Sequence, residues 1–464
     1  MTTQSVKQKN IYDIIPTRQK LRNIFTIMIP ILITQLAIMG MSVIDTAMSG
    51  HASANDLAGV AMGSSLWIPI LTCFGAFVSA ETPIIAQHLG AGKDNEIAPT
   101  VRHGAYIAIN ISFLIIILGI FVVKPIFALL NLDPKVLEIS IGYLIALSFG
   151  IIPLFITISL RSFVDTLSYT SITMRLFIIA LPINALLNYI FIFGKFGSPV
   201  LGGVGAGLAT AITNWVLLFI FIFTIKKTER LNKYGIFSTI GRLEFYRIKE
   251  QLRIGIPIGV SIFFETSLFS GLTFVIAKFG TVVIAGHQAA MNFSSLLYMF
   301  PLSFSITLVI LVGYEVGAKR FDEAISYAKL GVGLNMFISW IFIALILLAR
   351  KHLATFYSND TAIINMTATF MFYVAFFQAF DSIGAPIQGV LRGYKDVDYP
   401  FYVSLLSFWG IALPLGYFID TKLGHGPESY WQGLIIGVLV SAIFLIARLL
   451  YRKKQATLHV LNNK

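Results

Sequence analysis

The feature that most constrains this chain is a series of long apolar stretches that recurs from one end to the other. Each is close to the ~20 residues that an α-helix needs to cross the hydrocarbon core of a bilayer. Only 12% of the 464 residues are charged, whereas a soluble domain is about a quarter charged. We expect twelve membrane-spanning helices: 24–48, 57–80, 104–124, 139–160, 174–194, 204–225, 252–277, 284–312, 329–349, 366–391, 400–419 and 430–450. The sequence therefore predicts an all-α integral membrane protein; buried core helices of a large soluble protein would not explain so many spans of this length.

The positive charges are unevenly divided between the two sets of connections. If the N-terminus is cytoplasmic, 27 of the 34 Lys and Arg residues fall in cytoplasmic segments and the other seven fall outside. This bias is typical of membrane proteins, in which cytoplasmic loops are enriched in Lys and Arg. We therefore expect a multi-pass protein of the cell membrane with both termini in the cytoplasm. The net charge of +12 is then a consequence of topology, and no nucleic-acid partner is expected.

The two halves of the chain resemble each other. Ile29-Pro30, Ala58-Gly59 and Gly90-Ala91 recur 227 residues later, and Leu160-Arg161 recurs after 231 residues. Six spans in each half place both halves the same way up, so the repeat is parallel, with its pseudo-two-fold axis along the membrane normal. We expect two pseudo-symmetric six-helix lobes around a central cavity, with these boundaries: cytoplasmic N-terminal segment 1–23, N-lobe 24–225, cytoplasmic linker 226–251, C-lobe 252–450 and cytoplasmic tail 451–464.

Three acidic residues lie well inside predicted spans: Asp45, Glu265 and Asp381. A charge at the bilayer centre costs at least ~2.5–3.5 kcal/mol on insertion scales, so it persists mainly where it faces a cavity or a partner. Glu265 and Asp381 are both near mid-depth in the second half. They are either protonated carboxyls that only pack between helices or a site that exchanges a cation or a proton, and we expect the second.

Polar side chains of three spans reach a similar depth in the first half. Asp45 lies in the outer part of the first span, and Asn184 and Asn188 share one face of the fifth. Thr210 lies near the outer end of the sixth span. These four side chains offer oxygen atoms suited to Na⁺ or to a proton relay. The alternative is that the amides and the hydroxyl only form interhelical hydrogen bonds.

Other motifs do not indicate an enzyme or a cofactor. The glycine-rich stretch 202–207 does not follow a strand, as a dinucleotide-binding loop would. No His-Glu zinc motif and no Ser/His set lies within a span, and Cys73 is the only cysteine. We therefore expect no catalysis, no cofactor and no disulfide.

The chain resembles the multidrug and toxic compound extrusion family, in its bacterial NorM-type branch. The resemblance covers about residues 20–450 and rests on the order of these stretches: "VIDTAMSGH", "AQHLGAGK", "GVGAGLATAITNW", "IPIGVSIFFE", "AGHQAA" and "FDSIGAPIQGVLRG". It implies a secondary antiporter that exports cationic or amphipathic drugs while Na⁺ or H⁺ enters. A monomer is expected.

The resemblance also assigns roles to individual residues. It implies cation or proton coupling at the carboxylates and polar groups named above (Asp45, Asn184, Asn188, Thr210, Glu265 and Asp381), and it places Gln288 near substrate. Some members of the family have an aspartate where Asn188 stands, and an acidic pair of some relatives appears here as Asn359-Asp360. Both departures leave the coupling ion open.

Two alternatives remain at the level of sequence. A lipid-linked saccharide flippase of the same superfamily would usually have fourteen spans and a cationic cavity, unlike this chain. The other alternative is a membrane receptor that transports nothing, but the buried carboxylates would then have no role.

Overall fold

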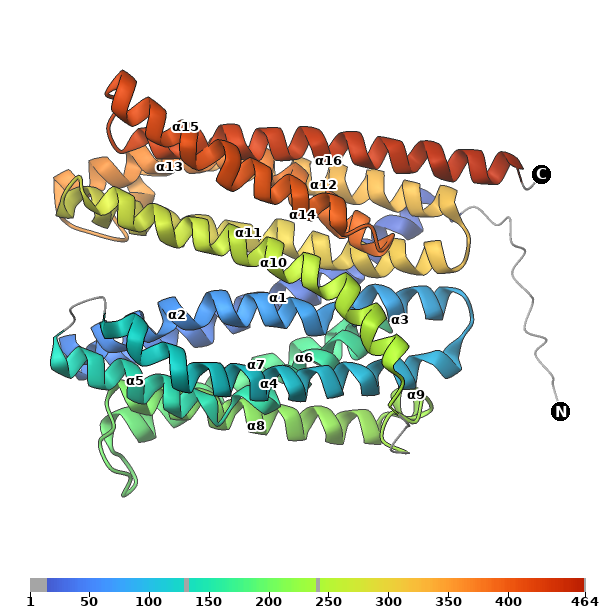
Figure 1. The fold of residues 1–464 in the computed structure, drawn as a ribbon, viewed down its shortest axis with the longest axis horizontal. Helices are drawn as coiled ribbons and strands as arrows, with labels where there is room; N and C mark the ends of the chain where they lie inside the picture. The colour runs from blue at the N-terminus through green and yellow to red at the C-terminus, as the bar shows by residue number, and fades with distance from the viewer. Residues whose placement is uncertain (1–14, 129–132, 239–242, 463–464) are drawn as a thin grey trace.

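The computed structural model describes residues 15–128, 133–238 and 243–462, and every regular element within them is helical (Figure 1). The first fourteen residues of the predicted N-terminal segment, part of the linker and the last two residues of the tail lie outside the described residues. The helices of the first half are α1 (Thr17–Ala52), α2 (Ala54–Ser79), α3 (Glu81–Gly90), the 3₁₀ turn η1 (Asp94–Glu96), α4 (Ile97–Ala128), α5 (Pro134–Ser148), α6 (Ile151–Thr166), α7 (Thr170–Phe193), α8 (Gly203–Lys227) and α9 (Glu229–Asn232).

The second half repeats this plan with one span built differently. Its helices are α10 (Phe245–Ala277), α11 (Thr281–Gly317), α12 (Phe321–Ala354), α13 (Thr361–Gly393), α14 (Asp398–Leu405), the π-helical segment η2 (Leu406–Ala412), α15 (Leu413–Phe418), a second π-helical segment η3 (Ile419–Leu423) and α16 (Glu428–Asn462). The segments from α14 to η3 form one continuous span.

Eleven helical spans of the described residues are long and apolar enough to cross a membrane, and α5 with α6 makes a twelfth if this pair is one span. The two helices of that pair are bent by 51°. The bend lies inside the predicted span 139–160, where Gly150 approaches α8 so closely that a Cβ would be 2.5 Å from the Cα of Ala211. The number of spans therefore agrees with the sequence, but the fourth is broken.

The helices extend past the predicted spans at both ends. α1 begins at Thr17 rather than at residue 24, and α11 continues to Gly317 rather than to residue 312. Arg161 and Arg392, which the sequence placed in cytoplasmic loops, lie within helices: Arg161 is five residues before the end of α6, and Arg392 is in the last turn of α13. Hydropathy marks the part of a helix that sits in hydrocarbon, whereas backbone hydrogen bonding continues into the polar ends.

The helices form two lobes that lie one above the other in Figure 1. Helices α1 to α9 make the lower lobe, and α10 to α16 make the upper one. The first helix of each half contacts the other half: α1 packs on α11, and α10 packs on α2. Gly255 and Gly259 of α10 allow this approach, because a Cβ on either would lie within 3 Å of atoms of Phe77.

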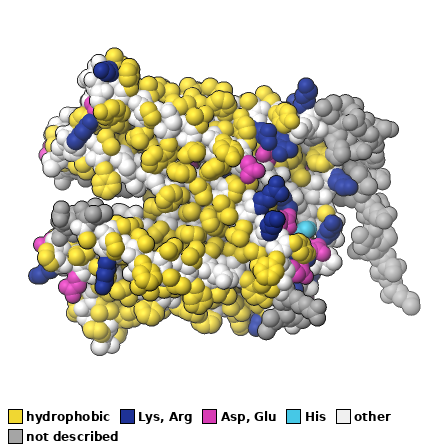
Figure 2. Space-filling model, viewed as in Figure 1, with side chains coloured by type: hydrophobic (Ala, Val, Ile, Leu, Met, Phe, Trp, Pro, Cys, Tyr) yellow, Lys and Arg dark blue, Asp and Glu magenta, His cyan; other side chains and the backbone are white. Residues whose placement is uncertain are grey.

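The two lobes meet at one end of the molecule and separate at the other. We call the end at which α1 and α10 begin the closed end, and the opposite end the open end. In Figure 2 the lobes touch at the right, and a cleft divides them at the left. The sequence predicted two lobes around a cavity, and the structure shows a cleft between the lobes at the open end.

Two pseudo-symmetric ion pairs join the lobes at the closed end. Lys20 of α1 lies 2.7 Å from the carboxylate of Glu323 on α12, and Arg247 of α10 lies 2.7 Å from that of Glu96 in η1. The partners correspond under the 227-residue repeat: Lys20 with Arg247, and Glu96 with Glu323. Each pair therefore links the first helix of one half to the other half. We call these two pairs the closed-end ion pairs.

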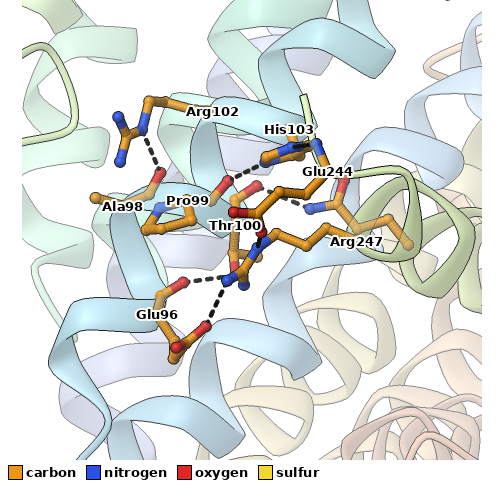
Figure 3. A network of polar contacts seen from close by, with 9 residues as sticks. Glu96, Ala98, Pro99, Thr100, Arg102, His103, Glu244 and Arg247 are labelled. Atoms are coloured by element: carbon orange, nitrogen blue, oxygen red, sulfur yellow. Dashed lines mark hydrogen bonds and ion pairs between the residues drawn. The ribbon is translucent and has the colours of Figure 1, made fainter. Parts of the chain in front are cut away.

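Further hydrogen bonds surround the Arg247 pair, as Figure 3 shows. The backbone N–H of Glu244 donates to Nε2 of His103, while Nδ1 of His103 contacts the carbonyl of Pro99. Gln251 donates to the carbonyl of Thr100. The beginning of α10 is thereby fixed to α4 of the other lobe.

Candidate functional site

The four polar residues of the first lobe lie together near the open end. Asp45 is seven residues from the end of α1, and Thr210 is seven residues from the beginning of α8. Asn184 and Asn188 lie on one face of α7, in its second half. At 1.5 Å per residue all four are within about 15 Å of the helix ends at the open end.

Hydrogen bonds connect these four side chains into one network. Nδ2 of Asn188 donates to Oδ1 of Asp45 at 2.5 Å, and the hydroxyl of Thr210 donates to Oδ2 of Asp45 at 2.7 Å. Asn188 also donates to Asn184 at 3.2 Å, and Asn184 donates to Thr210 at 3.4 Å. The structure thus brings together all four residues that the sequence predicted at one depth. Their role in ion coupling stays a prediction.

Some acceptor oxygens of this network lack a hydrogen-bond donor among the described residues. Both asparagines are fully buried, and Asp45 is 6% exposed. Oδ1 of Asn188 is buried and, within the described residues, has no hydrogen-bond partner. An ionised carboxylate offers about four lone-pair sites, so two donors leave Asp45 only partly satisfied. A proton, or a cation bound by oxygen atoms, would complete the site.

The carboxylates of the second lobe lie within electrostatic reach of each other. Asp381 is buried, and its Oδ2 has no partner among the described residues, while Glu265 is partly exposed. Both carboxylates interact electrostatically with the hydroxyl of Tyr298, and Glu265 interacts with the guanidinium of Arg392. The second-lobe cluster therefore contains these four groups, two of which the sequence did not predict.

Arg392 differs from its counterpart in the first lobe, Arg161, because the aspartate it would pair with is bound elsewhere. In the first lobe Arg161 lies 3.2 Å from Asp165 one turn later. The corresponding aspartate of the second lobe, Asp396, is bound instead by two arginines of α16 at 2.8 and 2.7 Å. Among the described residues, the guanidinium of Arg392 donates a hydrogen bond to Gln388 alone, at 3.3 Å. Its charge is thereby available to the Glu265 cluster.

Gln288 does not join either cluster. It is exposed on α11, beside the buried His287. In the described part of the chain the structure gives it no hydrogen bond to Glu265 or Asp381. Its predicted place near substrate stays a prediction.

Glu81 is a fully buried carboxyl that was not predicted from the sequence. The predicted second span ended at residue 80 and left Glu81 in a connection, but α2 and α3 together form one span from Ala54 to Gly90. The apolar residues from Pro83 to Ala86 were the signal that the span continues. Within the described residues there is no group of three or more His, Cys, Asp and Glu side chains that could hold a metal ion.

Comparison with known proteins gives a consistent result over nearly the whole chain. The MatE family model matches residues 30–190 and 257–418. The chain is 46% identical over 432 residues to a protein of Bacillus licheniformis named "Probable multidrug resistance protein NorM", covering 93% of this chain and 96% of that protein. It is also 46% identical over 438 residues to the protein of the same name in Bacillus subtilis (strain 168), covering 94% and 97%.

Solved structures share the fold at low sequence identity. The eukaryotic MATE transporter AtDTX14 has a TM-score of 0.85 at 20% identity, covering 95% of this chain and 98% of that one. A structure described as the outward-facing conformation of a multidrug resistance MATE family transporter has a TM-score of 0.86 at 16% identity, covering 94% and 97%.

Proposed function

Because this chain belongs to the MatE family, we propose that it exports small cationic or amphipathic compounds from the cell in exchange for inward Na⁺ or H⁺. The curated relatives named as multidrug resistance proteins support the substrate class. The observation that carries ion coupling is the buried network of Asp45, Asn188 and Thr210. A carboxylate at that depth, with an unsatisfied amide oxygen beside it, is suited to bind and release a cation.

The arrangement of the lobes supports the direction of transport. We place the closed end in the cytoplasm, because the connections at that end carry most of the Lys and Arg residues. Both termini are then cytoplasmic, and the cleft faces outward across the cell membrane. An ion entering this cleft reaches Asp45 near the open end. Its binding would favour one arrangement of the lobes only if the site differs between the two arrangements.

The second-lobe cluster supports a cationic substrate. Glu265 and Asp381 place two carboxyl groups in one region of the C-lobe, while Arg392 supplies a single positive charge. A cation that enters this region would compete with protons or Na⁺ for the same carboxylates. Exchange of one for the other is the physical basis of antiport in this proposal. We expect a monomer to be sufficient, because both clusters lie within single lobes.

Transport by purified protein in liposomes tests the proposal. A fluorescent cationic dye is loaded, and its movement is followed under an imposed Na⁺ gradient and, separately, an imposed proton gradient. We expect one of the two gradients to drive dye movement in the wild type and to fail in Asp45→Asn. Asp133→Asn is the matched control, because Asp133 is exposed and caps α5, a position that asparagine also suits. Dye movement that ignores both gradients in the wild type would contradict antiport.

A further inference from the structure

Glu81 is a buried carboxyl at the junction of α2 and α3, apart from both clusters described above. Its side chain is 0% exposed. The hydroxyl of Ser159 on α6 donates to Oε2 at 3.1 Å, and within the described residues Oε1 has no partner. α4 passes so close that a Cβ on Gly104 would lie 1.9 Å from Oε2. The carboxyl is thus enclosed by three helices.

The site lies in the half of the N-lobe opposite to Asp45. Gly104 is seven residues from the beginning of α4, and Ser159 is seven residues from the end of α6. Both of these helix ends are at the closed end, so Glu81 lies about 10 Å inside it. α3, which begins with Glu81, continues to the contact between the two lobes. Gln87 donates to the carbonyl of Gly393 at 2.8 Å, and a Cβ on Gly90 would be 1.9 Å from the carbonyl oxygen of Tyr314.

The pseudo-symmetry of the molecule shows that packing does not need a carboxyl here. The 227-residue repeat relates Glu81 to Leu308 and Gly104 to Gly331, and a Cβ on Gly331 would lie 2.5 Å from Cδ2 of Leu308. Ser159 corresponds, 231 residues later, to Val390, which belongs to the same buried cluster as Leu308. Where the second lobe has a leucine and a valine, the first has an acid and a hydroxyl.

No positive charge of the described residues compensates Glu81. The buried titratable groups of the surrounding helices have partners of their own: His103 of α4 with Pro99 and Glu244, Asp165 of α6 with Arg161, Glu315 of α11 with Arg320, and Arg392 of α13 with Gln388 and Glu265. Among the described residues only the Ser159 hydrogen bond stabilises an ionised form. One donor fills one of about four lone-pair sites, so an ionised carboxylate would be left poorly solvated. A neutral carboxylic acid fits these surroundings.

We propose that Glu81 is a second proton-binding site, which holds a proton while the closed end is shut and releases it when the loss of the α3–α11 contact lets α3 shift away from α4 and α6. The O–H bond of the acid breaks on release, and the proton passes to cytoplasmic water that enters between these three helices of the N-lobe. The proposal rests on the proposed function for its purpose. It gives the exporter a proton site that is exposed only in the inward-open arrangement.

Infrared difference spectroscopy tests the bound proton without any transport assay. We expect the carbonyl stretch of a protonated carboxylic acid in the wild type at neutral pH, and the loss of one such component in Glu81→Gln. The matched control is Glu138→Gln, an exposed glutamate of α5 that should leave this region of the spectrum unchanged. An unchanged protonated-acid band in Glu81→Gln would overturn the proposal, whatever the transport activity.

Transport by the same variants tests the use of that proton. We expect Glu81→Gln to keep exchange of dye for dye but to lose the dependence of export on internal pH. The double variant Glu81→Leu/Ser159→Val copies the packing of the second lobe, so it should fold and show the same loss. Retention of the wild-type pH dependence in that folded double variant would also overturn the proposal. If the wild type itself shows no gradient-driven export, the proposed function fails, and the infrared result still decides whether Glu81 holds a proton.

Discussion

Asp45 uses both carboxylate oxygens in hydrogen bonds to side chains of two other helices. We expect Asp45→Asn to abolish coupling to the ion gradient, because an amide cannot change its charge. Asn188→Ala removes one donor but no formal charge, and a charge-assisted hydrogen bond is worth about 1.5–3 kcal/mol. Gradient-driven export by the Asn188→Ala variant should therefore fall by about tenfold or more without vanishing. Gradient-driven dye export in liposomes measures the effect of each substitution. Equal losses of export in Asp45→Asn and Asn188→Ala would contradict the prediction that the first is the more severe.

Glu265 and Asp381 share a cluster with Tyr298 and Arg392. We expect Glu265→Gln and Asp381→Asn each to insert and fold but to lose coupled export, since a permanently neutral group cannot alternate between ion and substrate. Dye binding measured at two pH values should lose most of its pH dependence in both. Full gradient-driven export by both variants would remove the pair from the mechanism.

The residues of the N-lobe network could be predicted because depth follows from counting along spans of alternating direction. Asn184 and Asn188 are one helical turn apart, so their common face was also predictable. Arg392 was not, because its position depends on Asp396 being taken by arginines of α16, which lies far away in the sequence. Glu81 was assigned to a connection because the predicted span stopped one residue before it.

At the scale of elements, Asp396 holds α16 against the connection between α13 and α14. Burial raises the pKa of Asp396, but hydrogen bonds from Arg448 and Arg452 outweigh it and hold the pKa below its ordinary value. This stabilisation is present above the ordinary aspartate pKa of about 3.9 and is lost as the pH falls through the lower pKa of the folded protein. We expect Asp396→Asn to lower the free energy of unfolding by about 2 kcal/mol at pH 7. Thermal unfolding in detergent at pH 7 and pH 4 measures this, and the gap between wild type and variant should not widen on acidification.

The contact between α3 and α11 depends on two glycines that the repeat relates to each other. A Cβ on Gly90 would lie 1.9 Å from the carbonyl oxygen of Tyr314, and one on Gly317 would lie 2.1 Å from that of Gln87. Either alanine forces backbone apart, so we expect Gly90→Ala and Gly317→Ala to open the closed end. Distances between spin labels placed across that end should lengthen. Gly119→Ala is the control, because a Cβ there meets nothing within 4 Å.

The number and order of the spans followed from hydropathy, whereas their ends and breaks did not. The bend between α5 and α6 lies where Gly150 meets Ala211, and a contact between distant segments cannot be seen in a local apolar run. The predicted linker 226–251 likewise contains α9 and the beginning of α10. The polar residues of this segment gave no apolar signal, although α9 packs on α8 and the beginning of α10 is held by contacts with η1 and α4 of the other lobe.

At the scale of the whole molecule, the closed-end ion pairs must break whenever the lobes separate there. The side chains of Lys20 and Glu323 are only 6% and 11% exposed. Removing one partner of a buried pair is strongly destabilising, by about 3–5 kcal/mol, because it leaves a charge unpaired. We expect Lys20→Met to shift the molecule toward an inward-open arrangement, as measured by the spin-label distances. The exchanged pair Lys20→Glu/Glu323→Lys should restore most of the closed population, and no recovery would show that the pair does not hold this end.

The two closed-end ion pairs are what an isologous dimer interface looks like when both subunits belong to one chain. In such an interface residue i of one copy meets residue j of the other, and j meets i in return. Lys20 with Glu323 and Arg247 with Glu96 obey this rule. So do the close contacts of Gly90 with Tyr314 and of Gly317 with Gln87. The covalent connection between the halves is then not what holds them together. Two separately synthesised halves, cut between residues 238 and 243, should find each other in the membrane and form one transporter.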